Sequence, residues 1–224
     1  MIKPVRKAVF PVGGQGTRFL PATKAVPKEL LPVVDRPLLQ YAVDEARAAG
    51  IEHFVFVTAR GKSALEDYFD VAGELVASLK AKGKTAELAV LDETQLVPGA
   101  ISYVRQQEPA GLGHAVWCAR AITGDEPFAV LLPDELLWSP EAPALKEMVA
   151  VYERLGGNLI SVIEVPADHV NRYGIVTPGA VDGLVTEVKG FVEKPRVAEA
   201  PSRLAAIGRY ILQPEVMTAL SAHK

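Results

Sequence analysis

A short apolar run followed by a glycine-rich turn constrains this chain more than any other feature. Residues 9–32 read VFPVGGQGTRFLPATKAVPKELLP, and the apolar run meets the turn at Gly13–Arg18. Glycine permits positive φ angles and lets a ligand approach the backbone where a Cβ would otherwise stand. Successive backbone N–H groups in such a turn can converge on an anion. The segment therefore predicts a buried strand whose exit forms an anion-binding loop.

Positive charge is concentrated in the same part of the chain. Residues 1–28 hold six cations and no acidic residue, the cations being Lys3, Arg6, Lys7, Arg18, Lys24 and Lys28. The whole chain carries a net charge of −3, so a broad face for a nucleic-acid polymer is not indicated. Local charge beside a glycine turn favours a small polyphosphate ligand. The alternative is an ordinary glycine-rich connection with solvated lysines.

The turn matches neither of the two common phosphate-binding motifs. A dinucleotide fingerprint would place a third glycine where Phe19 stands, and a P-loop would require Gly-Lys-Ser/Thr after four spacer residues, which is absent. A dehydrogenase is therefore disfavoured. Pro27 and Pro32 argue against a helix directly after the turn, because proline breaks helical hydrogen bonding. We expect residues 17–32 to run as an extended, ordered loop.

Composition indicates the cellular compartment in which such a chain is expected. The single cysteine among 224 residues, Cys118, cannot form an internal disulfide, which is consistent with a reducing cytoplasm. The apolar run after Lys7 is too short for a signal peptide, and no apolar stretch reaches membrane-spanning length. We expect a cytoplasmic protein that binds neither a membrane nor a nucleic-acid polymer.

Apolar runs and helical periodicities alternate along the chain. Strands are predicted at residues 5–12, 53–58, 101–105, 128–132, 158–165, 174–176, 185–193 and 204–212. Helices are predicted at residues 38–49, 63–69, 73–82, 114–121, 144–155 and 214–222. Ser63 and Glu66 have the spacing of a capping box. The alternation predicts an α/β fold with a mostly parallel central sheet flanked by helices.

Ligands of such sheets bind beyond the carboxyl ends of the strands. The glycine turn Gly13–Arg18, the second glycine loop Gln106–Gly113 and Asp134 each follow a predicted strand. Asp134 is placed to hold Mg²⁺, which takes a few carboxylates together with substrate phosphate oxygens. The alternative for Asp134 is a turn or capping aspartate. Glu135 is either a second ligand or a solvated side chain.

Three further positions carry weaker signals. Glu193 and Lys194 end a predicted strand, where a glutamate could accept sugar hydroxyls and a lysine could meet a phosphate. Gly174 would permit close approach of a ligand, or mark a β-bulge. His114 has no partner at metal-ligand spacing, so we interpret it as a helix-start residue. No activated nucleophile is evident. The glycine loop, the cations and the metal-capable aspartate together favour phosphoryl or nucleotidyl transfer, where catalysis is mostly positioning and charge stabilisation.

These motifs resemble those of the bacterial UTP–glucose-1-phosphate uridylyltransferases, also called UDP-glucose pyrophosphorylases. The resemblance rests on GGQGTRFLPATKAVPKELLPVVDRPLLQYAVDEA at 13–46, VRQQEPAGLGHAV at 104–116, LLPDE at 131–135, RYGIV at 172–176, GFVEKP at 190–195 and AAIGRYIL at 205–212. It implies a Rossmann-like nucleotidyltransferase fold and a homodimer or homotetramer. Family members are longer, so we expect residues 1–224 to form a single nucleotidyltransferase domain that lacks the family's C-terminal segment, which carries a second metal-binding aspartate.

The resemblance also implies roles for individual residues. The uracil and ribose would be held by Gly13, Gly14, Gln106 and Gly111. The phosphates of UTP would be held by Gly16, Thr17, Arg18 and Lys28. Mg²⁺ would be bound by Asp134. Glucose 1-phosphate would be held by Gly174, Glu193 and Lys194. The catalytic cations would be Arg18, Lys28 and Lys194, and Gly13 replaces the alanine that is usual in the family.

The implied reaction transfers UMP from UTP to glucose 1-phosphate by in-line attack, giving UDP-glucose and pyrophosphate. No strong general base is required, because a phosphomonoester with a second pKa of about 6 is already largely ionised at neutral pH. Two alternatives stay open. One is the same chemistry on dTTP or on another sugar 1-phosphate, although the motif GLGHA and the insert at residues 73–100 favour the uridylyltransferase branch. The other is a nucleotide-binding protein with weak catalysis.

Overall fold

The computed structural model describes residues 2–139 and 141–222, so the outermost positions of the expected 1–224 domain lie outside the described residues. The described residues form an eight-stranded sheet in the order β5-β4-β1-β6-β10-β8-β9, with β7 also paired to β10. Its strands are β1 (Lys7–Pro11), β4 (His53–Thr58), β5 (Ile101–Arg105), β6 (Phe128–Leu131), β7 (Leu159–Glu164), β8 (Gly174–Asp182), β9 (Val185–Glu193) and β10 (Leu204–Leu212). A separate two-stranded ribbon pairs β2 (Pro32–Val33) with β3 (Arg36–Pro37).

The two halves of the sheet differ in strand direction. Strands β5, β4, β1 and β6 are all parallel, which confirms the expected α/β core. Strand β10 then runs antiparallel to β6, β7 and β8, and β8 and β9 form an antiparallel hairpin. The sequence did not reveal this antiparallel extension, because an apolar run predicts a strand without giving its direction.

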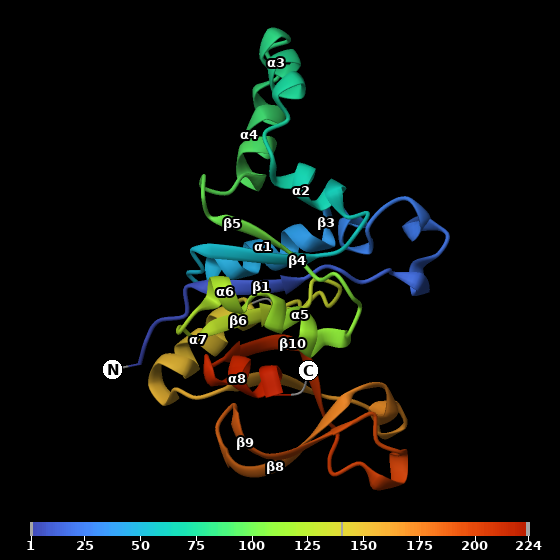
Figure 1. Ribbon diagram of the computed structural model, residues 1–224, viewed down its shortest axis with the longest axis vertical. Coiled ribbons are helices and arrows are strands. Elements are labelled where there is room, and N and C mark those ends of the chain that lie inside the picture. Colours follow the sequence, from blue (N-terminus) through green and yellow to red (C-terminus); the bar gives the residue numbers. More distant parts are fainter. Residues whose placement is uncertain (1, 140, 223–224) are drawn as a thin grey trace.

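Helices cover both faces of the parallel half (Figure 1). They are α1 (Leu38–Ala48), α2 (Ser63–Phe69), α3 (Gly73–Ala81), α4 (Thr85–Thr94), α5 (Gly111–Cys118), α6 (Arg120–Thr123), α7 (Ala144–Leu155) and α8 (Glu215–Ala222). Alternate side chains of β1 pack on opposite faces, as a strand's two-residue period requires. Phe10 packs with residues of α1, α2 and α7, whereas Val9 packs with residues of α5 and α8. The sheet is therefore buried on both sides, and its strands are correspondingly apolar.

Most predicted elements are found within one or two residues, but four predictions were wrong in detail. Strand β8 runs from Gly174 to Asp182, well beyond the predicted residues 174–176. Residues 17–32 do not run extended throughout, because they contain the 3₁₀ turns Thr17–Phe19, Ala22–Lys24 and Lys28–Leu30. Helix α5 begins at Gly111, so His114 lies inside it. Ser63 is the first residue of α2, preceded by Lys62, and no side chain caps that helix end.

Helices α3 and α4 project away from the sheet, at the opposite end of the molecule from β8 and β9 (Figure 1). Neither helix contains a buried residue. Within residues 2–139 and 141–222, no helix is both long and apolar enough to cross a membrane.

Candidate active site

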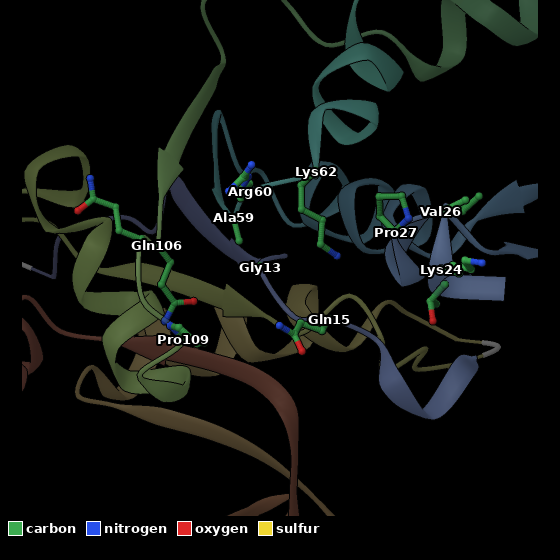
Figure 2. A pocket seen from close by; sticks show the side chains of 14 residues that line it. Gly13, Gln15, Lys24, Val26, Pro27, Ala59, Arg60, Lys62, Gln106 and Pro109 are labelled. Atoms are coloured by element: carbon green, nitrogen blue, oxygen red, sulfur yellow. The ribbon is translucent and has the colours of Figure 1, made fainter. Parts of the chain in front are cut away.

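A cavity of about 340 Å³ opens beside the carboxyl ends of β1, β4 and β5. Figure 2 shows Gln106 on one side of this cavity and Lys24, Val26 and Pro27 on the other. The lining comprises Gly13, Gln15, Thr23, Lys24, Ala25, Val26, Pro27, Ala59, Arg60, Gly61, Lys62, Gln106, Gln107 and Pro109. The two glycine loops predicted to form a site, after β1 and after β5, therefore meet at one end of the sheet.

The first glycine loop is shaped around the Lys28 side chain. Gly16 has φ +67°, and a Cβ added there would lie 3.0 Å from Lys28 Cβ and 3.1 Å from Thr23 Cγ2. A Cβ at Gly14 would lie 3.4 Å from Lys28 Cε. The Thr23 hydroxyl donates to Gly16 O at 2.7 Å and closes the loop. Glycine at position 16 is thus required both by the left-handed backbone and by the close approach of Lys28.

The second loop presents the amide of Gln106. Its Nε2 donates to Gly111 O at 3.1 Å and also lies 3.1 Å from His114 Nδ1. Its Oε1 faces the first loop, because a Cβ added at Gly13 would lie 3.3 Å from it. That contact is tight but short of a collision, so the family's usual alanine differs little in space from Gly13. Gln106 and Gly13 therefore share one wall of the cavity.

Lys28 joins the first loop to the exit of β6. Its Nζ lies 2.5 Å from Asp134 Oδ2, and both side chains are only partly exposed. Asp134 follows β6, as predicted, and its carboxylate has a cation as its neighbour. Thr17 and Arg18 begin the 3₁₀ turn after Gly16 and are exposed, outside the lining of the cavity. The structure thus brings Lys28 and Asp134 together and leaves Arg18 at the surface.

The exit of β6 is held by Arg209, a residue that the sequence reasoning missed. Arg209 is 1% exposed, and its guanidinium donates to Leu132 O at 3.1 Å and to Glu135 O at 3.0 Å. The same guanidinium binds the Glu45 carboxylate, with Nη2 2.7 Å from Oε2. Glu45 Oε1 accepts the amide of Leu145 at the start of α7. This network fixes the backbone on both sides of Asp134.

Glu135 has a backbone partner in the structure. Its Oε2 accepts the backbone N–H of Gly208 at 2.9 Å, so the carboxylate points to β10. A Cβ at Gly208 would lie 2.6 Å from Leu132 Cβ, which shows how closely β10 and the β6 exit approach each other. Asp134 is thus the carboxylate of this segment that is not committed to a backbone amide.

A second buried ion pair, between Lys62 and Glu29, stands behind the cavity. Lys62 Nζ lies 2.8 Å from Glu29 Oε2, while Glu29 Oε1 is buried and finds no hydrogen-bond partner among the described residues. Burial raises the pKa of Glu29, and Lys62 offsets part of that rise. The pair anchors two walls of the cavity, since Lys62 lines it and Glu29 lies in the turn that follows Pro27.

The residues expected to hold a sugar phosphate form a separate group on the β8–β9 hairpin. Gly174 pairs with Glu193 in the sheet, and a Cβ at Gly174 would collide with the Phe191 ring and approach Glu193 Oε2 to 3.0 Å. Lys194 has φ +47°, unusual for a residue with a Cβ, and its Nζ lies 3.0 Å from Glu193 Oε1. An exposed pair of this kind is weak, so both side chains are free to engage a ligand.

Tyr210 connects this group to the β6 exit. Burial raises the pKa of Tyr210, and the carboxylates of Glu135 and Glu193 raise it further. Neither Glu193 nor Lys194 lines the described cavity. Within the described residues, no three acidic, histidine or cysteine side chains gather into a preformed metal site.

Comparisons with known proteins identify the family of this chain. Residues 7–224 match the family described as nucleotidyl transferase. The UTP–glucose-1-phosphate uridylyltransferase of Komagataeibacter xylinus is 52% identical over 99% of this chain and 78% of its own length. A UDP-glucose pyrophosphorylase solved with UDP-glucose is 44% identical with a TM-score of 0.83, covering 99% of this chain and 80% of that chain. A UTP-bound UGPase from Acinetobacter baumannii is 42% identical with a TM-score of 0.90, covering 99% of this chain and 78% of that chain. The chain therefore belongs to the nucleotidyl transferase family, among relatives named UTP–glucose-1-phosphate uridylyltransferases.

Proposed function

We propose that this chain transfers UMP from UTP to glucose 1-phosphate, giving UDP-glucose and pyrophosphate. The observation that carries the proposal is the cavity in which Gly13 and Gln106 face each other beside the glycine loop, in a chain 52% identical to a uridylyltransferase. The lining combines small and apolar residues with polar side chains, among them the amide of Gln106, whose oxygen faces Gly13. A nucleobase fits that combination, since it offers two faces and a polar edge.

The phosphates of UTP would then follow the glycine loop away from the base. The backbone of Gly16 and the first 3₁₀ turn, with Thr17 and Arg18, would contact them. Lys28 lies against Gly14 and Gly16, and its ammonium group would contact the α-phosphate. Arg18, exposed in this structure, would meet the outer phosphates and steady the departing pyrophosphate. Gly111 contributes through its carbonyl, which holds Gln106.

Mg²⁺ fits the carboxylate at Asp134. Mg²⁺ is usually bound by one or two carboxylates together with substrate phosphates and water, and Asp134 is the carboxylate at the β6 exit that no backbone amide occupies. The ammonium group of Lys28 lies against the Asp134 carboxylate, so a cation is favourable at this position. When bound, the ion would neutralise charge on the triphosphate. Lys28 would be released from Asp134 to meet the α-phosphate.

The bond changes in the proposed reaction balance without a protein nucleophile. A phosphate oxygen of glucose 1-phosphate forms a bond to the α-phosphorus of UTP, and the bond from that phosphorus to the bridging oxygen of the β-phosphate breaks. Pyrophosphate leaves with the electron pair. The attacking phosphate is already ionised near pH 7, so the protein need only align the groups and stabilise charge.

Glucose 1-phosphate would bind at the β8–β9 hairpin. Gly174, which pairs with Glu193 in the sheet, would lie close to the sugar, Glu193 would accept sugar hydroxyls, and Lys194 would meet the phosphate. The Glu193–Lys194 pair is largely exposed, so exchanging it for a charged ligand carries little penalty.

The test is pyrophosphate release by the 224-residue chain with Mg²⁺. We expect UTP with glucose 1-phosphate to be preferred over dTTP and over galactose 1-phosphate. Lys194→Ala is expected to lower turnover while leaving UTP affinity unchanged, and Asp134→Asn to abolish the metal-dependent rate. Preference for dTTP would assign the chain to thymidylyl transfer instead. UTP binding without turnover would leave a nucleotide-binding protein.

Three expectations from the sequence stay predictions. They are a single nucleotidyltransferase domain over residues 1–224, assembly into a homodimer or homotetramer, and a cytoplasmic location.

A further inference from the structure

We infer that His114 is a positioning residue that selects the nucleobase by fixing which end of the Gln106 amide faces it. The inference rests on the proposed function, in which the base lies against Gly13 and Gln106. It assigns a role to a histidine that the sequence suggested only as a helix-start residue.

The Gln106 amide has two possible orientations, and its neighbours decide between them. One neighbour is the carbonyl of Gly111, which can only accept, so the group 3.1 Å from it is the NH₂. The second neighbour of the same nitrogen is His114 Nδ1, also at 3.1 Å. Both hydrogens of the NH₂ are therefore engaged on the side away from the cavity. The oxygen is left facing Gly13.

This arrangement also fixes the tautomer of His114. Because Nδ1 accepts from Gln106, the ring proton resides on Nε2 in the neutral imidazole. That nitrogen lies 4.0 Å from Cys118 Sγ, one helical turn further along α5. The ring is stacked on Trp117, with centroids 5.8 Å apart. The ring is held by packing as well as by its hydrogen bond, as a positioning residue requires.

An oxygen facing the base accepts a hydrogen bond and cannot donate one. Uracil carries a hydrogen on N3 and can donate it, whereas cytosine N3 is itself an acceptor. A Gln106 oxygen held toward the base therefore favours UTP and repels CTP. A site built to bond one base edge rejects the wrong edge because buried polar groups are left unpaired. Thymine has the same N3–H, so His114 would not distinguish UTP from dTTP.

Two substitutions at one position separate the hydrogen bond from the packing. His114→Phe keeps a ring against Trp117 but removes the acceptor. His114→Asn places a carbonyl oxygen where Nδ1 stands, and so keeps the acceptor while removing the ring. His53→Phe is the matched control, because His53 is also part-buried and bonds a side chain, Ser102 Oγ at 2.9 Å, at the other end of β4.

The measurements are equilibrium binding of UTP and CTP, and KM and kcat for pyrophosphate release with each nucleotide. In His114→Phe we expect the UTP-over-CTP preference to fall about fivefold or more, as for loss of one hydrogen bond. The change should appear in KM, with kcat for UTP within about twofold. His114→Asn and His53→Phe should keep the wild-type preference.

The outcomes separate this inference from the proposed function. An unchanged preference in His114→Phe would overturn the role of His114, and so would an equal loss in the Phe and Asn variants, which would trace the effect to ring packing. A wild-type chain that binds UTP over CTP yet releases no pyrophosphate would refute the proposed function. In that case the equilibrium binding measurements with UTP and CTP would still test the role of His114.

Discussion

Arg209→Met is the substitution whose effect follows most directly from the structure. The guanidinium is 1% exposed and bonds the Glu45 carboxylate and the carbonyls of Leu132 and Glu135. Methionine fills similar space but has no donor, so among the described residues it leaves the buried Glu45 carboxylate with the Leu145 amide as its one remaining hydrogen-bond partner. Removing one member of a buried ion pair costs about 3–5 kcal/mol of unfolding free energy.

For a domain of this size, that loss corresponds to a fall in melting temperature of about 6–20 °C. The assay is thermal unfolding followed by circular dichroism. The double variant Arg209→Met with Glu45→Leu should recover part of the loss, since it removes the unpaired charge. Because the lost bonds flank Asp134, turnover below the melting temperature should also fall about tenfold, as when a partner that orients a metal ligand is removed.

A fall in melting temperature of less than about 2 °C would refute the reasoning for the network, since it would correspond to about 1 kcal/mol or less. Lower stability with unchanged turnover would show that Arg209 stabilises the fold but does not position Asp134 for the reaction. Glu45→Gln supplies an independent check. It keeps the shape of the side chain, so any loss it causes reports the charge together with one acceptor, because both Glu45 oxygens accept hydrogen bonds.

Three further predictions follow from single residues. Gly174→Ala should raise KM for glucose 1-phosphate and leave UTP affinity unchanged, because the new Cβ meets the half-exposed Phe191 ring. The free energy of unfolding should change by about 1 kcal/mol or less, and a change in UTP affinity would contradict the prediction. Burial and Lys7 lower the pKa of His53 from 6.5, so below pH 6.5 the unfolded chain binds a proton more readily than the folded chain does. The free energy of unfolding should therefore decrease as the pH is lowered through this range, and urea unfolding of His53→Phe should show a flatter pH dependence. Lys28→Ala should tighten Mn²⁺ binding measured without nucleotide, because it removes the cation 2.5 Å from Asp134, while lowering kcat; weaker binding would place the metal elsewhere.

Local patterns gave the elements but not their long-range partners. The glycine turn, the strand before it and the helices were readable because glycine, apolar runs and 3.6-residue periodicity act over a few residues. Arg209 and Glu45 are 164 positions apart, and neither belongs to a local motif. The family resemblance identifies Gln106, yet the hydrogen bond between Gln106 and His114 depends on α5 beginning at Gly111 and not three residues later. Only the folded chain reveals that geometry.

The site was predicted in parts rather than as a whole. The rule that ligands bind at the carboxyl ends of strands selected both glycine loops and Asp134, and the structure places all three at one end of the sheet. The rule could not show that Glu135 is committed to the Gly208 amide, or that Lys62 and Glu29 form a buried pair beside the cavity. Those contacts depend on how β10 and α2 approach the loops, and no periodicity encodes that.

The most direct test of the central claim follows the α-phosphorus of UTP. The wild-type chain would be incubated with glucose 1-phosphate, Mg²⁺ and UTP labelled with ³²P at the α-phosphate, and the products separated by anion-exchange chromatography. In-line nucleotidyl transfer predicts that the label appears in UDP-glucose and that the released pyrophosphate is unlabelled. Label that stays in UTP, or that appears only in UMP, would contradict transfer to the sugar phosphate.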